Sequence, residues 1–322
     1  MKISYWTVET GLEDYMRDSY KLNPNILLNI LKFNPMWEHE IKEFGVRLMT
    51  DSGGWQMQKG QITSFDILLE NYQKVIKFSD FLFSIDVPDY CGDFNKSIEK
   101  TIEMLKRQWE YCDGYQDKLI SILHGATFPQ FNKWLEDTAT PFGTGRVSLA
   151  NKQVTKFSVS TPETRFIYFL YLLCKYPDLN WRQVHLMGTF SPRLLIYIKP
   201  IYDLMADRVE DLTFDSKIIK ITSVNLTRFL FKNGRITYER INKGDTQSID
   251  NVFYGKLIYE NLKTFLDFSD YLFNKVSLEE WKKEYLSSIK NEVVSKCLYY
   301  LIKGDKNKII SLLEGGSLRL EL

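Results

Sequence analysis

The chain alternates between short apolar runs, rich in β-branched and aromatic residues, and longer stretches with helical periodicity. Residues 46–50 read Val-Arg-Leu-Met-Thr and end at Asp51, and residues 119–123 read Leu-Ile-Ser-Ile-Leu and end at His124. Runs of this kind are typical of strands buried in a parallel sheet. The strand candidates are residues 3–8, 25–31, 46–50, 81–85, 119–123, 146–150, 184–187 and 209–214.

Amphipathic stretches separate these runs. Ser64 precedes an apolar stripe formed by Ile67, Leu68, Tyr72, Val75 and Ile76, which predicts a helix over 64–78 with Ser64 as its N-cap. Residues 96–109, 162–176 and 192–205 show the same periodicity, the last two with Pro near the start. A strand followed by a helix at intervals of about 25 to 40 residues is the βα unit of a parallel sheet.

Two parallel architectures fit repeated βα units: a doubly wound sheet and a (β/α)8 barrel. A doubly wound sheet would also place ligands at strand ends, but no glycine-rich phosphate-binding motif follows any strand candidate. We therefore favour a (β/α)8 TIM barrel with a helical C-terminal extension. Residues 251–273, 278–304 and 306–313 are expected to be helical. The expected division is a catalytic barrel over 1–250 and, over 251–322, the helical completion of the barrel and the extension.

Polar residues occur where four of the strand candidates end: Asp51, Asp86, His124 and Asp215. In a barrel these ends share the face on which active sites are built. Singly, each has a plain structural explanation, namely a tight turn, a capped turn, a packed imidazole and a helix N-cap. Their recurrence at four strand ends favours a shared site, in which two carboxylates could serve as nucleophile and general acid/base at a glycosidic carbon.

Composition narrows the classes of protein that remain. With 21 Phe, 19 Tyr and 7 Trp in 322 residues the chain is not a disordered one. The N-terminal residues lack the apolar region of a signal peptide, and the longest apolar run, 166–174, is too short to span a membrane. The four cysteines are dispersed, without a close-paired metal pattern. We expect a cytoplasmic protein, in a bacterial or phage-infected cell, with no membrane partner.

Four segments resemble the signature blocks of one enzyme family, in the family's order over about half of the chain. Thr50-Asp51-Ser52-Gly53-Gly54-Trp55-Gln56 is similar to the DSGG-aromatic-Gln motif of the tRNA-guanine transglycosylases. Ile85-Asp86-Val87-Pro88 resembles their Asp-x-Pro strand end. Val184-His185-Leu186-Met187-Gly188-Thr189 resembles their H-L-x-G segment, and Phe214-Asp215-Ser216 the sequence around their nucleophilic aspartate.

The resemblance implies a base exchange. Asp215 would be the nucleophile that forms a covalent glycosyl-aspartate, and Asp51 the general acid/base. Asp86 would accept hydrogen bonds from the N–H groups of a guanine-type base. The remaining base-binding positions would be Ser52, Gly53, His124, Ser148, Leu149, Met187 and Gly188.

The sequence also departs from the family. His124 stands where the family usually has Gln, and residues 146–151 lack the expected glycine pair. The C-x-C-x-x-C zinc motif of the tRNA enzymes is absent, so we expect no zinc, no other cofactor, and no separate zinc or RNA-binding domain. These differences favour the DNA-guanine transglycosylases of bacterial and phage 7-deazaguanine systems, which act on DNA with a free 7-deazaguanine (preQ0-type) and possible helper proteins.

The charge pattern agrees with a polyanionic partner. The whole chain has a net charge of +1, yet residues 217–243 contain seven basic residues and one acidic residue, a net charge of +6. The expected nucleic-acid contacts are Lys217, Lys220, Arg228, Lys232 and Arg235, interleaved with Phe229, Phe231 and Tyr238 as stacking side chains. A solvated surface is the alternative explanation of this basic segment. The alternative functions are a tRNA-guanine transglycosylase, a non-catalytic nucleic-acid-binding subunit, and a glycoside hydrolase.

Overall fold

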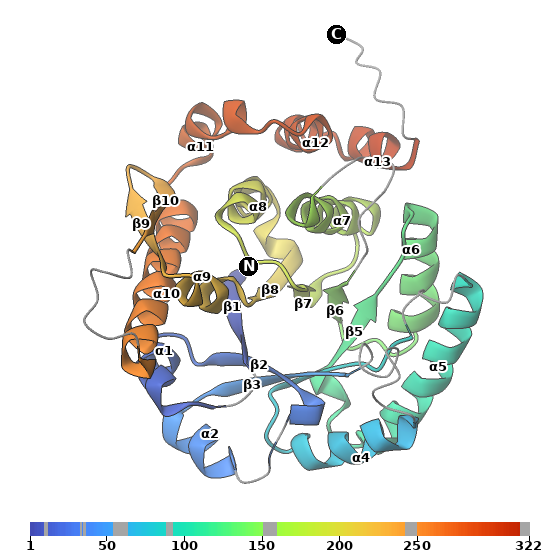
Figure 1. Cartoon of the computed structure of the whole chain (residues 1–322). Helices are drawn as coiled ribbons and strands as arrows, with labels where there is room; N and C mark the ends of the chain where they lie inside the picture. The colour runs from blue at the N-terminus through green and yellow to red at the C-terminus, as the bar shows by residue number, and fades with distance from the viewer. Residues whose placement is uncertain are drawn as a thin grey trace.

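The computed structural model of the chain describes residues 1–9, 12–32, 34, 37–53, 64–87, 93–150, 160–241 and 250–315. Eight parallel strands close into a barrel in chain order, with helices around it (Figure 1), which confirms the predicted (β/α)8 fold. The strands are β1 (Lys2–Glu9), β2 (Asn25–Asn29), β3 (Arg47–Asp51), β4 (Phe81–Phe83), β5 (Leu119–Leu123), β6 (Arg146–Leu149), β7 (Trp181–Leu186) and β8 (Val209–Ser216). All eight coincide with strand candidates from the sequence.

The barrel closes through the ladder between its first and last strands. β1 pairs with β8 from Lys2 opposite Asp211 to Thr7 opposite Ser216. A doubly wound sheet has two open edges, so this ladder excludes that alternative. Side chains alternate along each strand, and one set fills the barrel interior. This interior cluster consists of Trp6, Leu27, Met49, Phe83, Ile120 and Ile122.

The helices begin where side chains can cap them. Ser64 accepts a hydrogen bond from the backbone N–H of Asp66, as predicted, and Ser191 accepts one from that of Leu194. The apolar run 166–174 lies in α7, which is buried on all sides between the barrel and an outer layer. The helices up to β8 are α1 (Arg17–Leu22), α2 (Glu38–Phe44), α4 (Phe65–Val75), α5 (Phe94–Tyr111), α6 (Phe128–Trp134), α7 (Thr161–Lys175) and α8 (Pro192–Met205).

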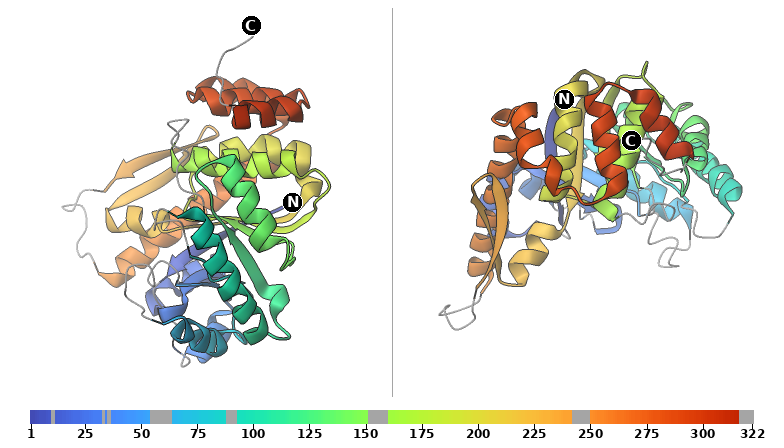
Figure 2. Two further views of the ribbon diagram at one scale, coloured as in Figure 1. Left: turned by 90° about the vertical axis from the view of Figure 1, so that its right-hand side faces the viewer. Right: turned by 90° about the horizontal axis from the view of Figure 1, so that it is seen from above.

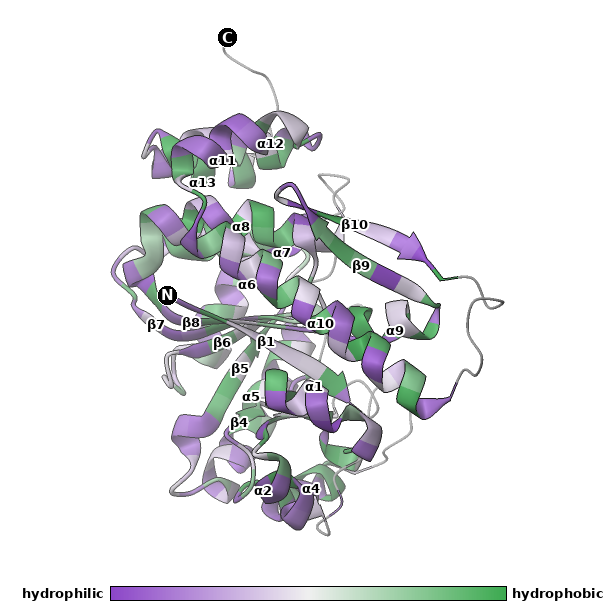
Figure 3. Cartoon of the chain, turned by 90° about the vertical axis from the view of Figure 1, so that its left-hand side faces the viewer, coloured by the Kyte–Doolittle hydropathy of each residue, from purple (hydrophilic) through white to green (hydrophobic). Residues whose placement is uncertain are grey.

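The chain after β8 adds a hairpin and a second layer. A short helix, α9 (Ile218–Val224), leads into the hairpin of β9 (Thr227–Lys232) and β10 (Arg235–Arg240), which lies alongside α10 (Asn251–Asn274) (Figure 3). α10 packs between α1 and α8 and takes the place of the eighth barrel helix. Three further helices, α11 (Leu278–Glu284), α12 (Glu292–Ile302) and α13 (Lys306–Gly315), cover α7 and α8 from outside (Figure 2).

The prediction of one helix over 278–304 was wrong, because this segment forms two helices. α11 ends at Glu284, and polar side chains then take over backbone groups. The hydroxyl of Ser288 donates to the carbonyl oxygen of Tyr285, and the side chain of Asn291 accepts from the N–H of Val294 to start α12. Ser and Asn side chains compete in this way for the backbone groups that a continuous helix would pair. The apolar periodicity of the sequence does not reveal this competition.

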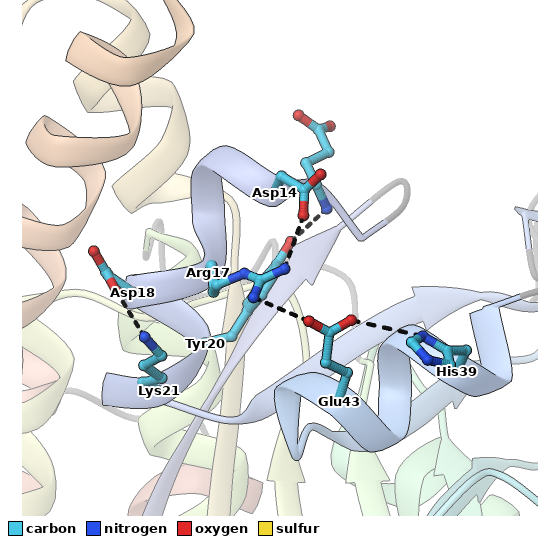
Figure 4. Close-up of polar contacts among 8 residues, drawn as sticks. Asp14, Arg17, Asp18, Tyr20, Lys21, His39 and Glu43 are labelled. Carbon is cyan, nitrogen blue, oxygen red and sulfur yellow. Dashed lines mark hydrogen bonds and ion pairs between the residues drawn. The ribbon is translucent and has the colours of Figure 1, made fainter.

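A network of ion pairs ties α1 to α2 on the outer surface (Figure 4). Arg17 contacts Asp14 at 3.3 Å and Glu43 at 3.0 Å, and Glu43 also lies 3.6 Å from Nδ1 of His39. The His39 side chain is 83% exposed. One of the three histidines is therefore a surface residue, whereas the other two lie in the barrel.

Candidate active site

The barrel brings the four predicted polar residues to one end. Asp51 closes β3, Asp86 follows β4, His124 follows β5, and Asp215 is the penultimate residue of β8. Asp51 lies two positions after the interior residue Met49, and His124 two positions after Ile122, so both have the inward alternation. Asp215 stands opposite Trp6 of the interior cluster in the β1–β8 ladder. The C-terminal mouth of the barrel thus gathers these side chains at the face where barrel enzymes carry their active sites.

Asp215 is held through one of its two oxygens. Oδ1 lies 2.8 Å from Nε2 of His185 and accepts a 2.6 Å hydrogen bond from the N–H of Gly188. Nδ1 of His185 lies 2.8 Å from the hydroxyl of Thr213, which also accepts from Gln183 at 3.2 Å. A consistent chain of donors then runs from Gln183 through Thr213 and His185 to the carboxylate.

Asp215 also borders a hollow, although its side chain is only 8% exposed. Within the described residues, Oδ2 of Asp215 takes no hydrogen bond, and the residue lines a hollow of about 490 Å³. The other lining residues are Val8, Gly188, Ser216, Lys217, Ile218 and Ile221. Asp215 does not cap the next helix, because α9 begins after Lys217. Its anchored oxygen and its free oxygen suit an oriented nucleophile.

Asp51 has a different environment. Its Oδ2 accepts a 2.9 Å hydrogen bond from the side-chain amide of Asn29 on the neighbouring strand, and the N–H of Gly53 also bonds the carboxylate. Burial, followed by the negative charges of Asp86 and Asp215, raises the pKa of Asp51 from 3.8 to about 6, against the opposing effect of these hydrogen bonds. A carboxyl group that titrates near neutral pH is suited to general acid/base work.

Gly53 meets two requirements of this turn. Its φ is +76°, which favours glycine, and a Cβ here would lie 3.3 Å from both Ile30 and Leu68. The close approach explains a glycine directly after the Asp-Ser pair. The rest of this motif, Gly54, Trp55 and Gln56, lies outside the described residues, as do Pro88, Cys91, Asn151 and Lys243.

Asp86 is paired inside the protein. Its Oδ2 lies 2.6 Å from Nε2 of His124, and its Oδ1 accepts from the hydroxyl of Ser52 at 3.5 Å. Asp86, His124 and Ser52 are all buried. The imidazole also packs edge-on against Trp134, with ring centroids 4.8 Å apart. A base that bonds to Asp86 would therefore meet a carboxylate already oriented by His124.

The other predicted base-binding residues are placed unequally. Met187 is partly exposed and packs against the interior cluster at the mouth, and Gly188 contacts Asp215. Ser148 also has the inward alternation, but it is fully buried, and its hydroxyl has no hydrogen-bond partner in the described part of the chain. Leu149 alternates with it and packs into the outer core against the helices. The Leu149 side chain therefore points away from the barrel interior.

The predicted basic residues fall into two groups. Lys220 lies 2.9 Å from the buried Glu9, and Arg228 lies 3.2 Å from Glu260, so both already have acidic partners. Lys217, Lys232 and Arg235 are exposed and form no ion pair with any residue that the structure describes. The free positive charge is thus smaller than the sequence count suggests.

One of the three predicted stacking residues belongs to the core, and a second is partly buried. Phe229 is buried against Phe265 of α10, and Phe231 packs against Phe268 and Tyr271, because alternate side chains of the hairpin face that helix. The burial of Phe229 contradicts its prediction as a stacking residue, whereas the prediction for Phe231 stays a prediction. Tyr238 is 60% exposed and remains available to a ligand.

Sequence reasoning missed two residues of the site. His185 is fully buried and contacts Asp215, and Asn29 donates to Asp51 across the β2–β3 ladder. His185 alternates on β7 with Val184 and Leu186, which pack into the outer core, so strand alternation could have placed it inside. Asn29 had no comparable signal, because its role depends on the register between two strands.

Neither a scan against models of known protein families nor a search of curated proteins finds a match to this sequence. Over the described ranges, no group of three or more His, Cys, Asp or Glu side chains is arranged to hold a metal ion. In the same ranges no helix is both long enough and apolar enough to cross a membrane.

Proposed function

We propose that this protein is a DNA-guanine transglycosylase, which exchanges a guanine in DNA for a free 7-deazaguanine base of the preQ0 type. The observation that carries the proposal is a pair of carboxylates with contrasting environments at the barrel mouth. Asp215 is held by two donors on one oxygen, whereas the pKa of Asp51 is raised to about 6. Such a contrast separates a nucleophile from an acid/base residue.

The proposed reaction consists of two displacements at C1′ of the target nucleotide. Oδ2 of Asp215 attacks C1′, the bond to N9 breaks, and the departing guanine takes the electron pair and a proton from Asp51. The incoming 7-deazaguanine gives its ring N–H proton to the Asp51 carboxylate and attacks C1′, which releases the Asp215 carboxylate. The configuration at C1′ is retained, and no further co-reactant is required.

The selectivity for a guanine-type base is assigned to Asp86 with His124 and Ser52. A guanine edge offers adjacent N–H donors, which a buried carboxylate can accept in place of the long 3.5 Å contact from Ser52. The target nucleotide must leave its stack to reach the mouth, at a cost of a few kcal/mol.

The assignment of a nucleic-acid substrate is supported by exposed cations on the segment that follows Asp215 in the chain. Lys217 lines the hollow that contains Asp215. Lys232 and Arg235 stand directly opposite each other on β9 and β10, beside the Asn233–Gly234 turn. Like charges opposite each other destabilise a hairpin, and a phosphate group would relieve the repulsion. The preference for DNA over tRNA rests on the absent zinc motif.

The deciding experiment measures base exchange directly. The protein is incubated with labelled guanine or a preQ0-type base and either duplex DNA or tRNA, and the nucleosides are measured by mass spectrometry after digestion. Asp215→Asn should abolish both exchange and any trapped covalent adduct. Asp211→Asn is the matched control, because Asp211 is a carboxylate on the same strand, bonded to Ser4 at the opposite end of the barrel.

The outcomes separate the alternatives. Incorporation into tRNA alone would replace the DNA assignment with a tRNA-guanine transglycosylase. Binding to nucleic acid without incorporation into either substrate would favour the non-catalytic subunit. An undiminished adduct in Asp215→Asn would mean that the nucleophile is another residue.

A further inference from the structure

A buried arginine stands behind the peptide group that contacts Asp215. Arg165 lies on α7 and is 7% exposed, and its Nε donates a 2.9 Å hydrogen bond to the carbonyl oxygen of Met187. That carbonyl and the N–H of Gly188 belong to the same peptide group. The N–H in turn donates to Oδ1 of Asp215 at 2.6 Å. The guanidinium, the peptide and the carboxylate therefore form one continuous chain.

We propose that Arg165 is a positioning residue that acts on Asp215 through the Met187–Gly188 peptide. This inference rests on the proposed role of Asp215 as nucleophile. Because the peptide group is planar, fixing its carbonyl also fixes the direction of its N–H. A cation on the oxygen withdraws electron density from the peptide and makes the N–H a stronger donor.

The peptide needs such an anchor. Gly188 has a φ of +68°, and a Cβ at this position would lie within 4 Å of no other described atom, so side-chain packing from the described residues does not hold the turn. Neighbouring side chains hold Gly53 far more tightly. Arg165 reaches the peptide from a helix that is buried from Glu163 to Cys174, which is a rigid support compared with the loop itself. Burying a guanidinium is unfavourable unless the group is hydrogen-bonded, and the carbonyl oxygen of Met187 supplies one acceptor.

The anchored N–H matters most when Asp215 is the leaving group. In the glycosyl-aspartate the carboxylate has lost its charge, and it regains that charge as the incoming base displaces it. A strong donor on Oδ1 stabilises the developing charge and favours breakdown of the adduct. Loss of Arg165 should therefore slow breakdown more than formation, so that the covalent adduct accumulates.

The test compares Arg165→Met, which keeps an unbranched side chain but removes the guanidinium, with Arg165→Lys, which keeps the charge. We expect Arg165→Met to lower turnover roughly tenfold and to raise the fraction of enzyme trapped as adduct on a guanine-containing oligonucleotide. Arg165→Lys should recover most of the wild-type turnover. Arg193→Met is the control, because Arg193 lies in the first turn of the adjacent helix with a side chain that is 56% exposed.

A second measurement does not depend on activity. Hydrogen exchange at the Gly188 amide should be faster in Arg165→Met than in the wild type and in Arg165→Lys, at equal folded populations by circular dichroism. Unchanged exchange at Gly188 would overturn the inference, as would a fall of turnover and adduct together in a folded variant. If Arg165→Met does not fold, Arg165→Gln, which keeps a polar side chain but removes the positive charge, takes its place in both measurements with the same expected results. Absence of adduct in the wild type itself would instead refute the proposed function.

Discussion

The replacement Asp51→Asn should stabilise the protein while it removes the proposed acid/base group. The side chain keeps its size, and its amide oxygen can still accept the hydrogen bond from Asn29 that Asp51 accepts at 2.9 Å. What is lost is a negative charge that burial and two neighbouring carboxylates make unfavourable. The variant would then be more stable and less active than the wild type, which is a common result of substitutions at catalytic residues.

The magnitude follows from the two pKa values. The pKa of Asp51 is about 6 in the folded protein and 3.8 ordinarily, so the folded state binds the proton more tightly. Wild-type stability therefore falls as the pH rises from about 4 to about 6 and stays reduced above that range. The full shift corresponds to about 3 kcal/mol, and the partial exposure of Asp51 at the mouth lowers the expectation to roughly 1–3 kcal/mol.

Urea denaturation followed by circular dichroism, repeated between pH 4 and pH 8, measures this difference. Asp51→Asn should exceed the wild type in stability at pH 7.5 and converge with it near pH 4. Asp14→Asn, at a surface carboxylate whose side chain is 88% exposed, serves as the control and should show no comparable gain. A gain that is absent at pH 7.5, or equally large at pH 4, would refute the electrostatic reasoning.

Three further predictions concern a buried asparagine, a tight turn and the basic hairpin. Asn261→Ala should cost about 2–4 kcal/mol in urea denaturation, because the buried Asn261 accepts from the N–H of Phe229 at 2.6 Å and donates to Ser223 and to the carbonyl oxygen of Thr227. Gly125→Ala should lower the melting temperature far more than Gly114→Ala: both glycines have positive φ, but only at Gly125 would a Cβ lie 2.6 Å from a backbone nitrogen of α6. Arg235→Ala should weaken DNA binding and reduce its salt dependence by about one counterion in a fluorescence anisotropy titration, and an unchanged salt slope would place the nucleic acid elsewhere.

The apolar pattern was sufficient for the barrel because it depends on local and short-range physics. Each buried strand must be apolar and short, and each covering helix must show one apolar stripe. The spacing of these units left room for eight strands, and right-handed parallel connections restrict how such units assemble. The pattern was less informative after β8, where it predicted one helix over 278–304 in place of α11 and α12.

The sequence by itself also determined that Asp51, Asp86, His124 and Asp215 would meet, since parallel strands in a barrel end on one face. Only the tertiary structure decided their chemical states. Which donor reaches Asp215, and how far the pKa of Asp51 rises, depend on strand register and on packing between segments that are far apart in the chain. Arg165 shows the same limit: its distance to Met187 is set by how α7 packs on the barrel, and no local pattern records that contact.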